Sequence, residues 1–275
     1  MTLMGTMPLD DGGHLRFDDS GSGPVVVLMH PGLWDRRVWD DQMESFPAAG
    51  FRTIRYDQRG YGESSRLSGE PYSPVDDLLA LLDHLDVTQA AVVGCSIGGE
   101  IAIDFTLEHP DRVWALVPVA SAPSGFEPLE EEEDWWKEIS EPIDAAIEAG
   151  ELEQAEELRL AIWAPLGTDD EAGAKIRRIA FDNIHEMTMD ESSIIELDPP
   201  AAHRLAQIDL PTLVLVAEQD PSFSRRGGDV LAREILGAQR VVVEGADHVV
   251  NVRQPERFDA AVIPFLTASI PRSAE

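Results

Sequence analysis

The sequence predicts an α/β fold, in which a mostly parallel sheet carries helices on both faces and a helical lid interrupts the chain. Short apolar runs alternate with amphipathic segments between residues 24 and 122, and the same alternation resumes after residue 206. Between about residues 123 and 205, no segment has the pattern of a strand. At 275 residues, we expect one domain in three stretches: a first part of the core (1–122), a lid (123–205) and a second part of the core (206–275).

Each element of the first part is predicted from its own pattern. The turn Asp10–Gly13 predicts an antiparallel hairpin at the edge of the sheet. Apolar runs predict buried strands at Val25–Met29, Phe51–Tyr56, Ala90–Val93 and Val113–Val119. Apolar residues at helical spacing predict helices at Val38–Ala48, Val75–Leu85 and Ile97–His109. Strands and helices that alternate in this way are typical of a parallel sheet.

The insert and the second part differ in pattern. The insert contains the acidic run Glu130–Asp134, interpreted as a solvated lid surface, and helical segments at Ile143–Ile162 and Ala174–Ile184. The second part resumes the alternation, with strands at Leu213–Ala217 and Arg240–Val243 and helices at Arg225–Leu236 and Pro255–Ala268. A helical insert between two halves of one sheet is the simplest account.

The charge balance excludes some classes of partner. The 52 acidic residues outnumber 21 Lys and Arg, and the net charge is −31. This charge repels nucleic acid and anionic membranes, so we expect neither as a partner. It indicates a soluble acidic protein or an adaptation to high salt. The chain lacks a signal-peptide pattern and an apolar stretch of membrane-spanning length, and Cys95 is its single cysteine, so we expect a cytoplasmic protein.

The strongest chemical signal is the motif Gly94-Cys95-Ser96-Ile97-Gly98, which fits G-x-S-x-G between a strand and a helix. A sharp turn there exposes the serine, and small flanking residues let the backbones approach closely. The alternative is an ordinary helix start capped by Ser96. Cys95 precedes the apex of the turn, so we expect it to point into the core rather than act as nucleophile.

A serine hydroxyl needs a base, and the base needs an orienting carboxylate. The expected chain order is serine, acid, histidine, with the last two after later strands. Asp220 follows the strand Leu213–Ala217, and His248 follows Arg240–Val243. We therefore expect Ser96, Asp220 and His248 to form a catalytic triad. Glu218 is a rival acid and Asp247 a weaker one.

An oxyanion hole needs two backbone N–H donors. One is expected from Ile97, directly after the nucleophile, and the other from the loop that follows Val25–Met29. Pro31 has no N–H to donate, so Gly32 is the first choice and Leu33 the second. His30 is interpreted as a brace for this loop rather than a catalytic group.

Four tryptophans are candidates for the wall of an apolar substrate pocket: Trp34, Trp135, Trp136 and Trp163. Packing within the lid is the equal alternative for each. The histidines lack metal-ligand spacing, and the chain has no phosphate-binding glycine motif, so we expect neither a metal nor a cofactor.

The motifs H-P-G-L, D-Q-R-G-Y-G-E-S, G-C-S-I-G-G and D-H-V-V-N followed by P-E-R-F resemble the bacterial α/β-hydrolase superfamily over nearly the whole chain. The resemblance is greatest to small carboxylesterases, enol-lactone hydrolases and cofactor-free haloperoxidase-like enzymes. It implies the α/β-hydrolase fold with an eight-stranded sheet, a triad at Ser96, Asp220 and His248, and a structural turn at Asp57–Gly60.

The chain departs from the family pattern in two places. Pro31 stands where glycine is commoner, and Cys95 stands where C–C bond hydrolases usually carry asparagine. A serine at residue 96, rather than an aspartate, argues against the dehalogenases and epoxide hydrolases of this fold.

The expected function is hydrolysis of a carboxylic ester or lactone of a small, largely apolar molecule through an acyl-enzyme, by a monomer or homodimer. A C–C bond hydrolase and an acyltransferase or perhydrolase of the same fold are alternatives. A ligand-binding receptor without catalysis is an alternative of a different class.

Overall fold

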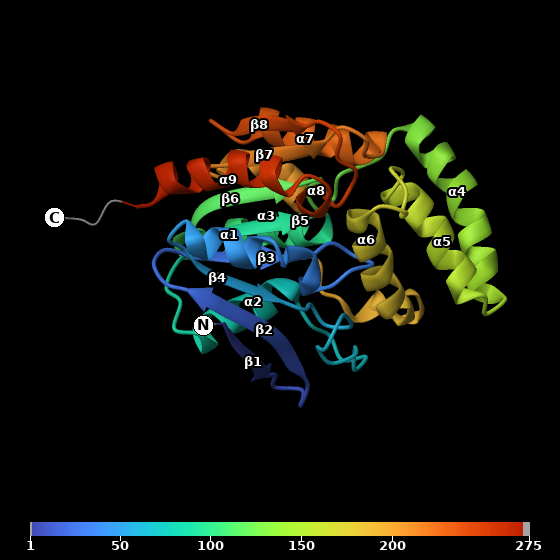
Figure 1. The fold of residues 1–275 in the computed structure, drawn as a ribbon, viewed down its shortest axis with the longest axis horizontal. Helices are drawn as coiled ribbons and strands as arrows, with labels where there is room; N and C mark the ends of the chain where they lie inside the picture. Colours follow the sequence, from blue (N-terminus) through green and yellow to red (C-terminus); the bar gives the residue numbers. More distant parts are fainter. Residues whose placement is uncertain (1, 272–275) are drawn as a thin grey trace.

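The computed structural model describes residues 2–271 and contains one eight-stranded sheet (Figure 1). The strands are β1 Leu3–Pro8, β2 His14–Gly21, β3 Val25–Met29, β4 Arg52–Tyr56, β5 Ala90–Cys95, β6 Val113–Val119, β7 Leu213–Ala217 and β8 Gln239–Val243. Their order across the sheet is β1-β2-β4-β3-β5-β6-β7-β8. The β1–β2 and β2–β4 pairs are antiparallel, and the pairs from β4–β3 to β7–β8 are parallel. The predicted fold class and edge hairpin are confirmed.

Helices connect and flank the strands. The α-helices are α1 Gln42–Ala48, α2 Pro74–His84, α3 Ile97–Glu108, α4 Glu130–Glu148, α5 Leu152–Trp163, α6 Glu171–Asp182, α7 Ser222–Glu234, α8 Val250–Arg253 and α9 Pro255–Ser269. The 3-10 helices are η1 Arg36–Trp39, η2 Pro110–Arg112, η3 Ile184–Thr188, η4 Glu191–Ser193, η5 Ala201–His203 and η6 Leu205–Gln207. Within residues 2–271, no helix is both long and apolar enough to cross a membrane.

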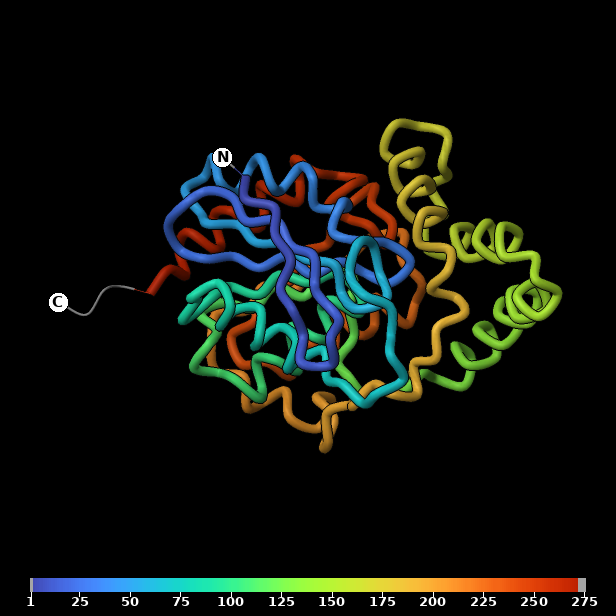
Figure 2. Tube along the Cα trace, turned by 90° about the horizontal axis from the view of Figure 1, so that it is seen from below, coloured from blue at the N-terminus to red at the C-terminus, as the bar shows by residue number. Residues whose placement is uncertain are grey.

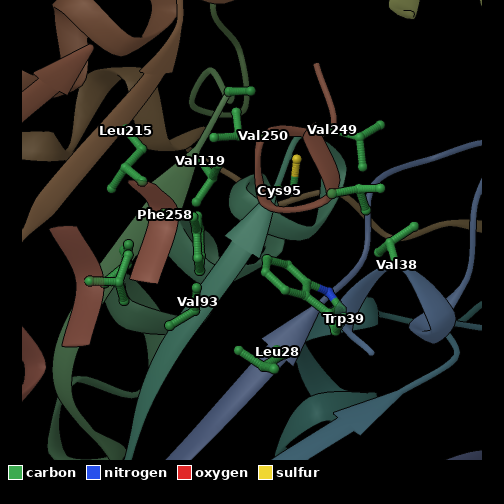
Figure 3. Close-up of a cluster of buried hydrophobic side chains, with 14 of the residues drawn as sticks. Leu28, Val38, Trp39, Val93, Cys95, Val119, Leu215, Val249, Val250 and Phe258 are labelled. Atoms are coloured by element: carbon green, nitrogen blue, oxygen red, sulfur yellow. The ribbon is translucent and has the colours of Figure 1, made fainter. Parts of the chain in front are cut away.

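Two apolar layers hold the sheet between its helices. Alternate residues of a strand point to opposite faces, so Val26 and Leu28 of β3 join one layer while Val27 and Met29 join the other. The first layer includes residues of α9 on its face, and the second includes residues of α2, α3 and α7. Figure 3 shows part of the first layer, where Cys95 lies among Val93, Val119 and Trp39.

Two predicted helices are corrected. The segment Val38–Ala48 is broken into η1 and α1, because the Asp35 side chain accepts the Arg37 N–H and starts a separate 3-10 turn. The segment Ile143–Ile162 is divided between α4 and α5. Gly150 takes φ of 76° at the break, a conformation that ends helices and that glycine adopts without a steric penalty.

The residues between β6 and β7 form a largely helical insert. Helices α4 and α5 pack against each other and project from the body of the molecule in both views (Figures 1 and 2). Helix α6 lies between this pair and the sheet (Figure 1). Ile194 of the insert makes one isolated bridge with Tyr72, and the insert's described residues form no strand of the sheet.

Candidate active site

The candidate residues follow strands that end at one edge of the sheet. Parallel strands β3, β5, β7 and β8 run in the same direction, so the loops that follow them meet at their carboxyl ends. Ser96 follows β5, Asp220 follows β7 and His248 follows β8. The Cys95 thiol also lies 3.3 Å from the His248 carbonyl oxygen, so the turn of Ser96 and the histidine loop are adjacent.

Ser96 sits in a strained turn between β5 and α3. Its φ of 54° and ψ of −120° are unusual for a residue with a side chain, at a cost of roughly 1–3 kcal/mol. The Ser96 N–H donates to the Val119 carbonyl at 2.9 Å. A Cβ added to Gly94 would lie 2.0 Å from the Gly98 oxygen, and one added to Gly98 would lie 2.5 Å from the Met29 oxygen. The turn is therefore possible only because both flanking residues are glycine.

His248 and Asp220 form a buried pair. The His248 Nδ1 lies 2.8 Å from Asp220 Oδ1, and the side chains are 4% and 1% exposed. An ionised carboxylate only accepts hydrogen bonds, so Nδ1 is the donor and the neutral imidazole keeps its lone pair on Nε2. This tautomer leaves Nε2 free to accept a proton.

The rival carboxylates have other partners. Glu218 is exposed, and its Oε2 accepts the Gly245 N–H at 3.0 Å. Asp247 is fully buried and accepts the Arg253 Nε–H at 2.9 Å. Burial raises the pKa of Asp247, although the charge of Arg253 opposes this. Of the three candidate acids, Asp220 has the hydrogen bond to His248.

The loop after β3 is held by His30. Its Nδ1–H donates to the Pro31 carbonyl at 2.8 Å, and its Nε2 accepts the Gln58 N–H at 3.0 Å. Burial lowers the pKa of His30, which favours the neutral ring that this pattern requires. Leu33 has φ of 68° in the same loop. Ile97 is the first residue of α3, where the N–H has no partner within the helix.

The tryptophans separate into two groups. Trp34 is fully buried and donates its Nε1–H to the Ile176 carbonyl at 2.9 Å. Trp163 is half-buried, with its ring centre 4.4 Å from that of His248. Trp136 lies 6.0 Å from Trp163, and Trp135 lies 6.1 Å from Trp136.

A pocket of about 500 Å³ lies beside this second group. It is lined by Pro128, Glu132, Glu133, Trp135, Trp136, Lys137, Ser140, Trp163, Pro221 and Phe223. Trp34 does not line it. Among the apolar lining residues, the sequence reasoning missed Pro128, Pro221 and Phe223. The only signal for the last two is that they lie one and three residues after Asp220. A second cavity, of about 30 Å³ beside Ile97, has room for about two water molecules.

Comparisons with known proteins agree with this geometry. The family model described as alpha/beta hydrolase fold matches residues 24–255. The chain is 28% identical to 3-oxoadipate enol-lactonase 2 of Acinetobacter baylyi, over 87% of each chain. It is 27% identical to a 2-hydroxy-6-oxononadienedioate/2-hydroxy-6-oxononatrienedioate hydrolase of Burkholderia vietnamiensis, over 94% of this chain and 93% of that one.

A solved structure titled as an N-acyl homoserine lactone degrading enzyme superposes with a TM-score of 0.70 and 26% identity. The match covers 96% of this chain and 99% of that one. Since the family model spans most of the sequence and the sheet has the expected order, the chain belongs to the alpha/beta hydrolase fold family.

Proposed function

We propose that this chain is a serine hydrolase that cleaves a carboxylic ester or lactone of a small, largely apolar molecule. The observation that carries the proposal is the 2.8 Å hydrogen bond between His248 and Asp220, at the edge of the sheet where Ser96 is held in a strained turn. Serine, base and acid in this arrangement perform acyl transfer on several unrelated folds. The similarity to an enol-lactonase and to a lactone-degrading enzyme supports the same class of reaction.

The reaction proceeds in two steps. His248 Nε2 removes the proton from Ser96 Oγ as that oxygen attacks the substrate carbonyl carbon, and Asp220 stabilises the charged imidazole. The N–H groups of Ile97 and of Gly32 or Leu33 stabilise the oxyanion. The imidazolium then protonates the leaving alcohol oxygen, and an acyl-enzyme remains. Water activated by His248 attacks this ester and releases the acid, which restores Ser96.

The pocket beside Trp163 supports a substrate of limited size. Its volume of about 500 Å³ lies in the range of roughly 300–1,000 Å³ that is usual for small-molecule sites. Tryptophan, phenylalanine and proline form most of its apolar wall. Of these lining residues, Trp163 packs against the His248 ring, and Pro221 directly follows Asp220. An apolar acyl or alcohol group bound there would contact Trp163, whose neighbours include the His248 ring.

Covalent labelling tests the nucleophile. A fluorophosphonate should modify Ser96 with one label per chain, because the activated oxygen attacks phosphorus as it attacks a carbonyl. Mass spectrometry of the digested protein locates the label. Ser96→Ala should abolish labelling, His248→Ala should slow it strongly, and Ser68→Ala, which removes an exposed hydroxyl outside the pocket, should leave it unchanged. Labelling at another serine, or undiminished labelling of His248→Ala, would contradict the assignment.

A substrate panel tests the substrate class. Short p-nitrophenyl esters and small lactones should have the highest kcat/KM. Each methylene that the pocket cannot accept contributes no binding free energy, a loss of about 1 kcal/mol that lowers kcat/KM roughly fivefold. Initial rates from acetate to palmitate measure this, and a vinylogous 1,5-diketone tests C–C bond cleavage in parallel. A maximum at about twelve carbons or more would contradict a small pocket, and turnover of the diketone alone would favour the C–C bond hydrolase.

A further inference from the structure

Asn183 lies directly after α6 and joins the insert to two loops of the core. The residue is fully buried, and its amide forms three hydrogen bonds. The Nδ2 group donates to Asp35 Oδ2 at 2.8 Å and to the Ile179 carbonyl at 2.8 Å. Its Oδ1 accepts the Gly62 N–H at 2.7 Å. Because both the NH2 group and the oxygen of the amide are hydrogen-bonded, the orientation of the side chain is fixed.

Asp35 is the anchor through which Asn183 reaches the loop after β3. Arg37 donates to the Asp35 carboxylate from its backbone N–H at 2.9 Å and from its guanidinium at 2.6–3.1 Å. Although burial alone would raise it, hydrogen bonds from Arg37 and Asn183 hold the pKa of Asp35 below its usual range. Asp35 is therefore an ionised acceptor at neutral pH, two residues beyond Leu33.

The neighbouring residue adds a second bond between the loop and α6. Trp34 donates its Nε1–H to the Ile176 carbonyl, one turn of helix before Ile179. The consecutive loop residues Trp34 and Asp35 are thus bonded to α6 and to the residue that follows it, respectively. His30 fixes the other end of the loop through Pro31 and Gln58. Gly32 and Leu33 lie between these two attachments.

We propose that Asn183 is a positioning residue for the oxyanion loop. This inference rests on the proposed function, in which Gly32 or Leu33 supplies one oxyanion donor. Leu33 has φ of 68°, so the backbone of this segment is strained and needs fixed neighbours to keep its N–H direction. Loss of the Asn183 amide removes the direct bond between Asp35 and the end of α6, and with it the link through Asn183 to Gly62, and the loop relaxes away from the geometry that stabilises the oxyanion.

The expected consequence is a loss of kcat. A displacement of about 1 Å at a reacting group costs about a hundredfold, and loss of a whole oxyanion donor costs about 10²–10³. Asn183→Ala and Asn183→Asp should therefore lower kcat by about 10–100-fold, with KM changed less than about twofold. A trifluoromethyl ketone, whose adduct places an oxyanion in the hole, should bind more weakly by the same factor.

Asp182→Asn is the matched control. Asp182 precedes Asn183 and pairs with Arg37 at 2.8 Å, but it lies on the exposed side of the helix end. This variant removes one ion pair from the same turn and keeps the bonds of the Asn183 amide, so kcat should stay within about twofold of the original protein. If Asn183 had only a structural role, Asn183→Ala would lower the melting temperature, but its kcat would not differ from that of Asp182→Asn.

A direct measurement of the loop separates this inference from the proposed function. Hydrogen exchange of the 32–35 amides should be at least about tenfold faster in Asn183→Ala than in Asp182→Asn, whether or not the chain hydrolyses esters. If Asn183→Ala does not fold, Trp34→Phe, which removes the bond to Ile176 together with part of a fully buried ring, should produce a change in exchange and kcat in the same direction. Unchanged exchange in the loop, or a raised KM at constant kcat, would overturn the inference.

Discussion

At the scale of single residues, the turn before α3 places two consecutive side chains, Cys95 and Ser96, in different environments. Ser96 is partly exposed, whereas Cys95 is fully buried in the first apolar layer, part of which Figure 3 shows. The Cys95 thiol donates to the His248 carbonyl at 3.3 Å. Burial raises the pKa of this thiol well above its ordinary value. Because the thiolate is the reactive form, Cys95 contributes packing rather than nucleophilic chemistry.

Alkylation tests this division of roles. Iodoacetamide at neutral pH should leave the folded chain unmodified and its turnover unchanged, because the thiol is protonated and shielded from solvent. In denaturant the same reagent should add one label per chain, as measured by intact mass. Cys95→Ala should take no label under either condition. Rapid alkylation of the folded chain, or turnover lost in step with it, would contradict the buried role.

Residue-level reasoning yields candidates where chemistry requires a short motif, and it misses contacts between residues that are distant in sequence. Ser96 was predicted from its own neighbours, and the chain order then predicted Asp220 and His248, whose side chains share a hydrogen bond of 2.8 Å. Asn183 lies 148 positions from Asp35, and an isolated asparagine gives no signal of such a contact. The Trp34 bond to Ile176 spans 142 positions and was missed for the same reason.

At the scale of elements, strands were predicted more accurately than helices. Val25–Met29, Val113–Val119 and Leu213–Ala217 have the predicted bounds, because strands buried on both faces are continuous apolar runs with polar ends. The helices of the insert have apolar positions on one side only, and periodicity continues across the turn at Gly150. The left-handed backbone at Gly150 ends α4 before α5 begins, and the glycine, rather than the apolar periodicity, is the sequence signal for this break.

Helix α5 carries a buried acid that destabilises the fold when it ionises. Glu156 is fully buried, its Oε1 has no hydrogen-bond partner, and its Oε2 lies 3.3 Å from the Arg159 guanidinium. Arg159 also contacts Glu186. Burial raises the pKa of Glu156 to about 7. Since this pKa is above that of the unfolded chain, its contribution to stability is present at low pH and is lost as pH rises through about 7.

Glu156→Gln should therefore stabilise the protein at alkaline pH. Its free energy of unfolding should exceed that of the original chain by about 1–3 kcal/mol at pH 8.5 and by much less at pH 5.5, where Glu156 is already protonated. Urea unfolding of both proteins at several pH values measures this difference. The other titrating groups are the same in both proteins, so their contributions cancel. Glu157→Gln, which removes an exposed partner of Arg177, is the control and should show no such trend. A difference that is constant with pH would argue against a buried ionisation.

At the scale of the whole molecule, the charge excess exceeds what ion pairing can neutralise. Arginines pair with acids throughout the described chain, and buried Arg36 contacts Asp18, Asp57 and Glu63. Even if every cation had one acidic partner, the net charge would still be −31. The unpaired acids repel one another over the surface, and this repulsion weakens as added salt shortens the screening length from about 10 Å at 0.1 M to about 3 Å at 1 M.

Thermal stability should therefore rise with salt. Salt weakens attractive pairs as well as repulsion, but exposed pairs contribute only about 0–1 kcal/mol each, and the acids are in large excess. We expect the melting temperature to increase between 0.05 and 1 M NaCl by roughly 2–4 °C for each kcal/mol of repulsion that is screened. A variant with Glu141→Gln, Asp144→Asn and Glu148→Gln, three exposed acids of α4, should show a smaller increase. Differential scanning calorimetry in NaCl and in KCl measures both proteins, and a melting temperature that stays constant or falls would mean that attractive ion pairs outweigh the repulsion.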